Sequence, residues 1–455
     1  MGVLNSRQSR LAVRQSVRDA GAAILGLWTA TNRSIVANAG AMIATTVVTS
    51  ALGAAYWLLA ARFFTQEVVG LAGASVSAMS LLGIAGTLGL GTLLIGELPR
   101  QRDNAAALLV TALLVAGGGA SVAASAFALI IPLFSDNLRP LGTTVGSVAL
   151  FAFGAGLAGL TLVLDQGLMG LLRGGVQLGR NVVFAVVKLG ALLVIGFWMY
   201  WDNWAAIYAT WVFGNAISLL FVAGSMFRSG MCWQRPRWGI LRRFRGTALL
   251  HHGLNLALWV PGFAMPIMAT ALLSPTANAY FYIASMVAGF VFAPPLALTT
   301  ALYAVGARTP AALAQRLRLT LVLALVAGLA ANLLLVSIGP VVLGFFGRDY
   351  AEQSVGMLRI IALIVFPIII KDHYVAIHRI SGRLSRAAAL IAIGSMGELA
   401  GATFGTIVGG LPGLALGWLI ASCLQAAVMC PVVYTAIRGG ASLRAEPLGD
   451  AQVVS

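Results

Sequence analysis

The stretch FPIIIKDHYVAIHRISGR, from Phe366 to Arg383, sets an apolar helical run against three consecutive charged or titratable residues. Lys371, Asp372 and His373 stand inside the apolar run, and arginines close it. A charge near the centre of a bilayer helix is costly, so such residues face a bundle interior, a partner charge or a water-filled cavity. The stretch therefore predicts a membrane helix whose interior side carries a site or an ion pair.

The rest of the chain is also typical of an all-α integral membrane protein. Of 455 residues, 60% are hydrophobic and 9% are charged, whereas soluble domains carry about 25% charged residues. Apolar segments long enough to cross about 30 Å of hydrocarbon recur along the sequence. They predict twelve membrane helices, at Ser34–Ala61, Val68–Leu94, Ala105–Phe134, Val145–Leu172, Val182–Met199, Ala205–Phe227, Thr247–Leu273, Tyr280–Val305, Thr320–Phe345, Ser354–Ile377, Ala387–Val408 and Leu414–Ile437.

The net charge of +16 follows the predicted topology. Of the 29 Lys and Arg, 23 lie before the first span, after the last, or in loops that follow even-numbered spans, against three on the other side. An excess of Lys and Arg in short loops marks the cytoplasmic side. We therefore expect the protein in the plasma membrane with both termini in the cytoplasm. Because the positive charge follows the topology, no nucleic-acid partner is expected.

The domain organisation predicted from these patterns is two lobes of six spans each. A cytoplasmic basic segment, 1–33, precedes the N-lobe, 34–227; a basic linker, 228–246, leads to the C-lobe, 247–437, and a cytoplasmic tail, 438–455. Even span numbers keep the halves in the same orientation, as in parallel repeats. An offset of 206 aligns Arg173 with Arg379 and would place Asp165 opposite Lys371.

Helical rise sets the depth of the charged residues inside the spans. Asp165, Lys188 and Lys371 each lie eight residues from an edge arginine, which is roughly 12 Å into the membrane. Asp372 is one residue shallower, and Glu398 is about 18 Å deep. Two interpretations stay open. In the first, the charges form structural ion pairs: Asp165 pairs with Lys188, and Glu398 pairs with Lys371 or Asp372. In the second, they line a water-filled cavity between the halves, in which the lysines bind an anion and the acids bind H⁺ or Na⁺.

Three further residues complete the candidate site. Arg62 and Arg359 join Lys188 and Lys371 as candidate substrate-binding cations, because Arg359 is expected near the outer surface, where it could receive a headgroup. His373 is a candidate proton relay beside Lys371. No cofactor, metal or disulfide is expected, since the sequence has no Walker A motif, no GxGxxG between a strand and a helix, and only three cysteines.

Three segments resemble a known family: YWLLAARFFTQEVVGLA (Tyr56–Ala72), ANAYFYIA (Ala277–Ala284) and FFGRDYAEQSVGMLRIIAL (Phe345–Leu363). They are similar to polysaccharide flippases of the multidrug/oligosaccharidyl-lipid/polysaccharide (MOP) exporter superfamily. The resemblance implies a MATE-like fold, two six-helix lobes around a cavity that opens alternately to each side, and an oligosaccharide on a polyprenyl diphosphate as substrate. Several relatives carry two further C-terminal helices, which this chain lacks.

The sequence thus predicts a transporter rather than an enzyme. The first hypothesis is a flippase for an anionic lipid-linked oligosaccharide in the bacterial inner membrane, coupled to H⁺ or Na⁺ and working beside glycosyltransferases or a polymerase. Lys188 and Lys371, the only two lysines of the chain, favour an anion. The alternatives are a cation-coupled multidrug exporter, an integral-membrane glycan polymerase or ligase, and a scaffold. Outer loops of about ten residues at most, near 135–144, leave little room for a catalytic domain.

Overall fold

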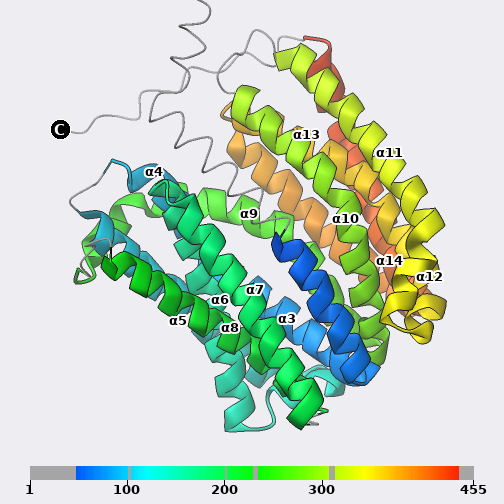
Figure 1. Cartoon of the computed structure of the whole chain (residues 1–455). Coiled ribbons are helices and arrows are strands. Elements are labelled where there is room, and N and C mark those ends of the chain that lie inside the picture. The colour runs from blue at the N-terminus through cyan, green and yellow to red at the C-terminus, as the bar shows by residue number, and fades with distance from the viewer. Residues whose placement is uncertain (1–47, 101–103, 200–201, 229–233, 307–312, 440–455) are drawn as a thin grey trace, which may run out of the picture.

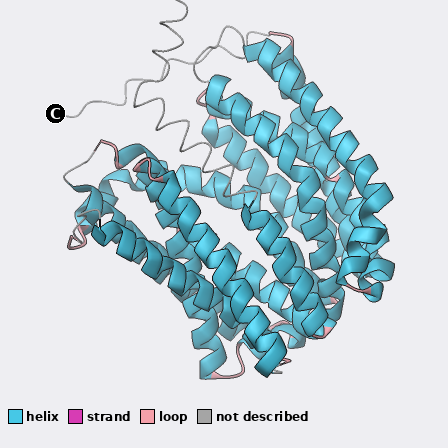
Figure 2. Ribbon diagram, in the orientation of Figure 1, coloured by secondary structure: helices cyan, strands magenta, loops and turns pink. Residues whose placement is uncertain are grey.

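The structure is a computed structural model that describes residues 48–100, 104–199, 202–228, 234–306 and 313–439. Within these ranges the chain consists of helices joined by short loops (Figure 2). Ten helical segments there are long and apolar enough to cross a membrane. The first predicted span, Ser34–Ala61, begins outside the described residues, and the chain is helical over 48–63. The count of twelve spans and the side of the termini stay predictions.

The N-lobe follows the predicted spans closely, with one division. Predicted span Val68–Leu94 forms two helices, because Leu88 (φ 47°) and Gly89 (φ 75°) both adopt left-handed backbone conformations that end a right-handed helix. The helices of this lobe are α3 (Gln66–Gly86), α4 (Leu90–Glu97), α5 (Ala105–Ile130), α6 (Val145–Gly170), α7 (Gly174–Val194) and α8 (Trp204–Arg228). Short turns at Ile131–Leu133 and Asp136–Leu141 follow α5, and a π-helical turn at Ile195–Met199 extends α7.

The C-lobe contains the longest helices. They are α9 (Trp238–Leu272), α10 (Pro275–Gly306), α11 (Leu313–Phe346), α12 (Arg348–Leu363), α13 (Val365–Ile380) and α14 (Leu384–Ile437). Predicted span Ser354–Ile377 is shared by α12 and α13. The 54 residues of α14 are two antiparallel arms, because the backbone reverses at Gly409 (φ −136°) and Gly410 (φ 57°).

The two arms of α14 pack so closely that only glycine fits between them. A Cβ added to Gly405 would collide with the Gly413 carbonyl oxygen, and one added to Gly417 would collide with the Gly401 carbonyl oxygen. Small residues that let helix backbones approach are a usual means of helix association in membranes. The predicted spans Ala387–Val408 and Leu414–Ile437 thus correspond to the two arms of α14.

The two groups of helices lie side by side, with α3 of the N-lobe packed on α9 and α10 of the C-lobe (Figure 1). Most hydrogen bonds between the lobes gather at one end of the bundle, opposite the ends that carry the basic loops after α4, α6 and α8. We call this set the outer seam. Its bonds join Arg62 Nε to the Phe345 carbonyl (2.9 Å), Gln66 Nε2 to the Asp349 carboxylate (3.0 Å), Asn137 Nδ2 to the Thr270 carbonyl (3.0 Å) and Asn278 Nδ2 to the Gly70 carbonyl (2.7 Å).

Candidate functional site

Lys188 is buried inside the N-lobe, with 4% of its surface exposed. Its ammonium lies 3.7 Å from the ring centre of Trp211, 4.7 Å from Phe184 and 4.8 Å from Tyr56. We call these three rings the aromatic cage. Among the described residues no carboxylate forms an ion pair with Lys188, so the rings are the groups that compensate its charge.

The cage is fixed by contacts within the N-lobe. The Tyr56 hydroxyl lies 2.6 Å from Thr210 Oγ1, and its ring packs edge-on against Trp211 at 5.9 Å. A cation–π contact is worth about 2 kcal/mol or more when it is desolvated. Three such contacts are of the same order as the roughly 2.5–3.5 kcal/mol that a lysine costs at the centre of a membrane helix. Aromatic packing thus makes an unpaired ammonium tolerable at this depth.

Asp165 does not pair with Lys188, and that expectation is wrong. The Asp165 carboxylate accepts two parallel hydrogen bonds from the guanidinium of Arg180, one of them 2.7 Å long from Nε to Oδ1. Asn181 Nδ2 donates to the same carboxylate at 3.3 Å, and Arg180 Nη1 reaches Ser218 Oγ at 3.5 Å. This geometry is the bidentate arginine–carboxylate pair, which is stronger and more directional than a lysine pair.

The error came from measuring depth against two different arginines. Helix α7 begins at Gly174 and not at Val182, so Arg180 belongs to its second turn instead of marking the membrane edge. Counted from the turn at Arg173, Asp165 lies eight residues back and Arg180 seven residues on, which places them face to face. Lys188 lies fifteen residues on, roughly 22 Å along the helix, and so about 10 Å deeper than Asp165.

Lys371 and Glu398 do form the predicted pair. The Lys371 ammonium donates to Glu398 Oε1 at 3.0 Å, and Trp418 Nε1 donates to the other carboxylate oxygen at 3.0 Å. Glu398 is 1% exposed and Lys371 is 8% exposed. The pair joins α13 to the first arm of α14, and Trp418 adds the second arm, so three crossings of the C-lobe meet at one carboxylate.

Asp372 and His373 face different environments from Lys371. Asp372 Oδ2 is buried without a hydrogen-bond partner among the described residues. His373 is fully buried, with Nδ1 2.8 Å from the Ile369 carbonyl and Nε2 3.2 Å from Thr320 Oγ1. Because a carbonyl only accepts, Nδ1 carries the proton of a neutral ring. The histidine ring is thus held on both sides, while the carboxylate keeps an unmet acceptor.

The two candidate arginines lie away from these buried charges. Arg62 is exposed and belongs to the outer seam through its bond to Phe345. Arg359, on α12, is exposed. The four candidate cations Lys188, Lys371, Arg62 and Arg359 therefore do not form one site. The aromatic rings around Lys188 belong to the N-lobe, and the carboxylate bound by Lys371 belongs to the C-lobe.

The aromatic cage nevertheless reaches the boundary between the lobes. Trp57 lies 6.4 Å from Trp211 and 4.6 Å from Tyr282 of α10, measured between ring centres. Tyr282 also covers Gly73 of α3, where a Cβ would stand 3.1 Å from the tyrosine ring. Lys188 is thus linked to the C-lobe through two intervening rings, so a movement of α10 against α3 would act on the cage.

The turns that precede α7 and α14 correct the repeat register. Arg173 (φ −103°, ψ 45°) caps α7 and Arg383 (φ −92°, ψ 47°) caps α14, each after a residue with positive φ, Leu172 or Gly382. The offset is therefore 383 − 173 = 210 rather than 206. Since 188 + 210 = 398, Lys188 is equivalent to Glu398, and the two lobes carry opposite charges at matching positions.

Sequence reasoning missed Arg180, Trp418 and the cage rings Tyr56 and Trp211. Arg180 could have been found by pairing residues about the break at Gly174, since residues equidistant from a helical turn face each other. Tyr56 and Trp211 lie on helices other than α7, and Trp418 lies on the second arm of α14, so no spacing within α7 or within the first arm of α14 points to them.

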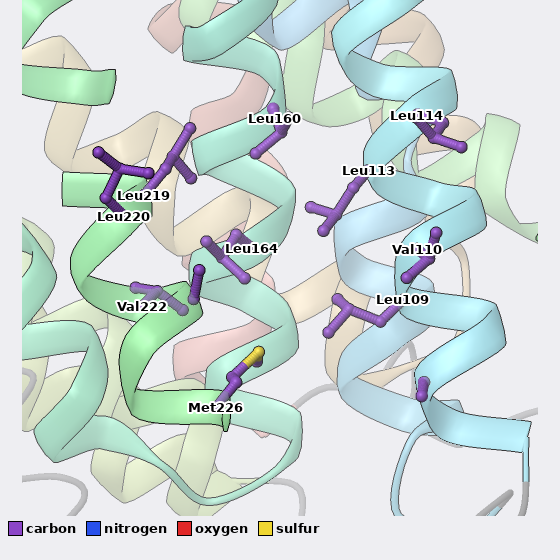
Figure 3. A pocket seen from close by; sticks show the side chains of 12 residues that line it. Leu109, Val110, Leu113, Leu114, Leu160, Leu164, Leu219, Leu220, Val222 and Met226 are labelled. Carbon is purple, nitrogen blue, oxygen red and sulfur yellow. The ribbon is translucent and has the colours of Figure 1, made fainter. Parts of the chain in front are cut away.

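A separate apolar groove of about 360 Å³ lies between α5, α6 and α8 (Figure 3). Its twelve lining residues are all apolar, and Leu109, Leu113, Leu164 and Met226 are among them. None of the candidate charged residues lines it. The groove is therefore not part of the candidate site.

No known family model matches the sequence, and no curated protein matches it. Solved structures do match. A multidrug resistance MATE family transporter of the MOP superfamily, in an inward-facing conformation, has a TM-score of 0.67 at 16% identity over 85% of this chain and 95% of that chain. The outward-facing conformation of such a transporter gives 0.54 at 14% identity, over 89% and 96%.

A MOP superfamily transporter from Pyrococcus furiosus, described as having a binding pocket of reverse polarity that suggests a different function, gives a TM-score of 0.54 at 13% identity over 89% of this chain and 96% of that chain. All three are described as transporters. The chain is a multi-pass membrane protein with the fold of the MATE transporters of the MOP superfamily.

Proposed function

We propose that this protein is an alternating-access exporter of an anionic, lipid-linked oligosaccharide across the bacterial plasma membrane. The fold supports the transport cycle, because its two lobes meet along α3, α9 and α10 and are bonded at the outer seam. In this arrangement the cargo would enter from the basic, cytoplasmic side. Parting of the outer seam would then release it outside.

The observation that carries the choice of cargo is the unpaired ammonium of Lys188. A buried lysine that already has a carboxylate partner, as Lys371 has in Glu398, is neutralised. Within the described part of the chain Lys188 contacts aromatic rings and no carboxylate, so an anionic headgroup could bind it without displacing an acid. Rings also present apolar faces to a sugar, which suits a glycan linked to a diphosphate.

The acids of the C-lobe are proposed to couple transport to a cation gradient. Asp372 has a buried, unpartnered oxygen, and Glu398 is held by Lys371 and Trp418. Intramembrane acids of this kind frequently mark proton or ion pathways. A proton or Na⁺ bound at Asp372 would neutralise this buried carboxylate. The site would release that ion as the lobes move.

A direct test uses export of the cell's own lipid-linked glycan and translocation of a lipid-linked oligosaccharide in proteoliposomes. Lys188→Ala should abolish translocation while the protein still inserts in the membrane at wild-type levels. Lys371→Ala should also abolish translocation, but it removes the partner of buried Glu398 and should therefore lower the stability of the protein as well. Arg318→Ala, on an exposed arginine of α11, is the matched control for loss of one positive charge. Wild-type export by Lys188→Ala would remove the anion-binding role.

A cation-coupled multidrug exporter is the second candidate, and the comparison structures favour it because two of the three are described as multidrug resistance transporters. The two candidates differ in the charge of the cargo. Proteoliposomes that accumulate an organic cation such as tetraphenylphosphonium, and leave the lipid-linked glycan untouched, would replace the first proposal by the second.

A further inference from the structure

The aromatic cage around Lys188 has the form of a binding site for an organic cation. Three rings from the 48–63 helix, α7 and α8 approach one ammonium group, at 3.7, 4.7 and 4.8 Å from their centres. Aromatic rings grouped about a cation are the usual means by which proteins bind alkylammonium ligands. Here the cation in the cage is part of the chain.

The cage exists independently of the lysine. The Tyr56 hydroxyl is fixed at 2.6 Å from Thr210 and 3.1 Å from the Ile207 carbonyl. Phe184 and Trp211 pack edge-on at 5.6 Å, and Tyr56 and Trp211 at 5.9 Å. These contacts hold the rings toward one another without any help from the Lys188 side chain, so its removal should leave their arrangement in place.

The polar atoms left over in the cage are donors. Trp211 Nε1 is buried without a hydrogen-bond partner among the described residues, and an indole N–H can only donate. Lys188 adds three ammonium protons and no acceptor. A second cation would therefore meet an ammonium and an N–H donor in the cage rather than a negative charge.

We propose that Lys188 determines the charge specificity of the N-lobe, because its ammonium occupies a cage that would otherwise bind a small organic cation. The lysine is a tethered occupant of the site. While it stays in the cage, alkylammonium compounds are excluded. Truncation of its side chain to alanine opens a cavity shaped for a linear alkylammonium ion, enclosed by the rings of Tyr56, Phe184 and Trp211.

The inference concerns binding, so it does not depend on the proposed cargo. Burial of the site does not prevent the test, since small ligands enter engineered cavities in protein interiors. A charge inside a membrane helix is energetically unfavourable. Because Lys188→Ala removes such a charge, this variant should fold. Lys188→Met, which refills the space with an uncharged chain of similar length, is the matched control.

The test is titration of full-length protein in detergent with n-propylammonium, which matches the three carbons and the ammonium that the truncation to alanine removes, followed by calorimetry and tryptophan fluorescence. Lys188→Ala should bind it saturably, at least roughly tenfold more tightly than wild type or Lys188→Met. n-Propanol, which has the same chain without the charge, should bind Lys188→Ala at least tenfold more weakly. Trp211→Leu added to Lys188→Ala should reduce propylammonium binding by about tenfold, because it removes the nearest ring.

Two results would overturn the inference. Equal propylammonium affinity in wild type, Lys188→Met and Lys188→Ala would place binding outside the cage. Equal affinity of Lys188→Ala for propanol and propylammonium would mean a plain apolar cavity with no preference for a cation. Neither result bears on glycan export, which is measured separately with Lys188→Ala in proteoliposomes.

Discussion

The charges of the two buried lysines in this chain are compensated in different ways. Lys371 is neutralised by Glu398, at 3.0 Å, whereas Lys188 relies on three aromatic rings. The first arrangement adds a carboxylate that must itself be desolvated. The second leaves the ammonium without a counter-ion. This difference is the basis of the roles that we propose for the two residues, a fixed joint in the C-lobe for Lys371 and a binding group in the N-lobe for Lys188.

Removal of one partner of the C-lobe pair should be strongly destabilising. Lys371→Met leaves Glu398 as a buried charge, and loss of one member of a buried pair typically costs about 3–5 kcal/mol. The double variant Lys371→Met/Glu398→Met should recover most of that loss, because well-packed apolar residues replace buried pairs at little cost. The measurement is the thermal midpoint of unfolding in detergent, followed by tryptophan fluorescence.

The exposed pair of Arg100 and Glu97 provides the control for this prediction. Their charged atoms lie 3.4 Å apart, with the arginine side chain 77% exposed, and such surface pairs contribute little. Arg100→Met should leave the midpoint nearly unchanged. A double variant no more stable than Lys371→Met would show that the pair does more than neutralise itself.

The sequence predicted which residues are buried and charged better than it predicted their partners. Lys371 and Glu398 were matched correctly because they lie on the two consecutive helices on either side of one turn, at 381–383. Asp165 was matched with Lys188 because depths taken from Arg173 and Arg180 looked equal, while Arg180 itself was the partner. Helical rise fixes depth only from a shared origin, and aromatic partners on other helices leave no trace in local spacing.

At the level of helices, the closest contact between the lobes is α3 against α10. Gly70 lies so near α10 that an added Cβ would collide with the Pro275 carbonyl oxygen. The Gly70 carbonyl oxygen also accepts a hydrogen bond from Asn278 Nδ2, at 2.7 Å. Gly70→Ala should therefore push α10 away from α3 and favour a conformation in which the outer seam is open.

Spin labels at the exposed positions Thr143 and Gln353, in a background without reactive cysteines, would measure this movement by pulsed electron paramagnetic resonance. The distance between labels should lengthen in Gly70→Ala. Gly289→Ala, also on α10, meets nothing within 4 Å and should keep the wild-type distance. An unchanged distribution in Gly70→Ala would mean that the helices absorb the methyl group locally.

The existence of the helices was predictable from hydropathy, because an apolar segment that crosses a bilayer must bond its backbone groups internally and so forms a helix. The positions of the helix ends were harder to predict. Apolar runs continue across Leu88–Gly89 and across Leu363–Ile364, where the helices divide, since a change of backbone direction inside the membrane alters no side-chain polarity. The reversal at Gly409–Gly410 was placed correctly, because glycines and Pro412 separate the two apolar runs there.

At the scale of the whole molecule, Lys188 and Glu398 place opposite charges at matching positions of the two lobes, and Lys371 neutralises Glu398 while buried Asp372 Oδ2 has no hydrogen-bond partner among the described residues. An anion bound in the N-lobe and a cation bound in the C-lobe would be coupled if both bias the same movement of the lobes. Collapse of the proton and sodium gradients should then slow glycan translocation in proteoliposomes several-fold. Unchanged rates would make transport passive and leave Asp372 and Glu398 as structural groups.

Transport by alternating access requires the outer seam to open in every cycle. Gln66 and Asp349 face each other there, with Nε2 and Oδ2 3.0 Å apart. Cysteines at both positions, bridged by a short bifunctional methanethiosulfonate, should hold the lobes together and stop translocation, and a reductant that cleaves the bridge should restore it. Export at the wild-type rate by fully bridged protein would contradict this, because a closed seam would then be no barrier to the cargo.

The matched control for the bridge lies within one helix. Arg348 and Glu352 are exposed, with side-chain atoms 2.7 Å apart on α12, so the same reagent across Arg348→Cys/Glu352→Cys spans no lobe boundary. Bridged protein of this kind should translocate normally, because α12 moves as part of the C-lobe. Since the two bridges lie at the same end and differ in whether they join the lobes, arrest by the first alone isolates lobe separation as the step that moves the cargo.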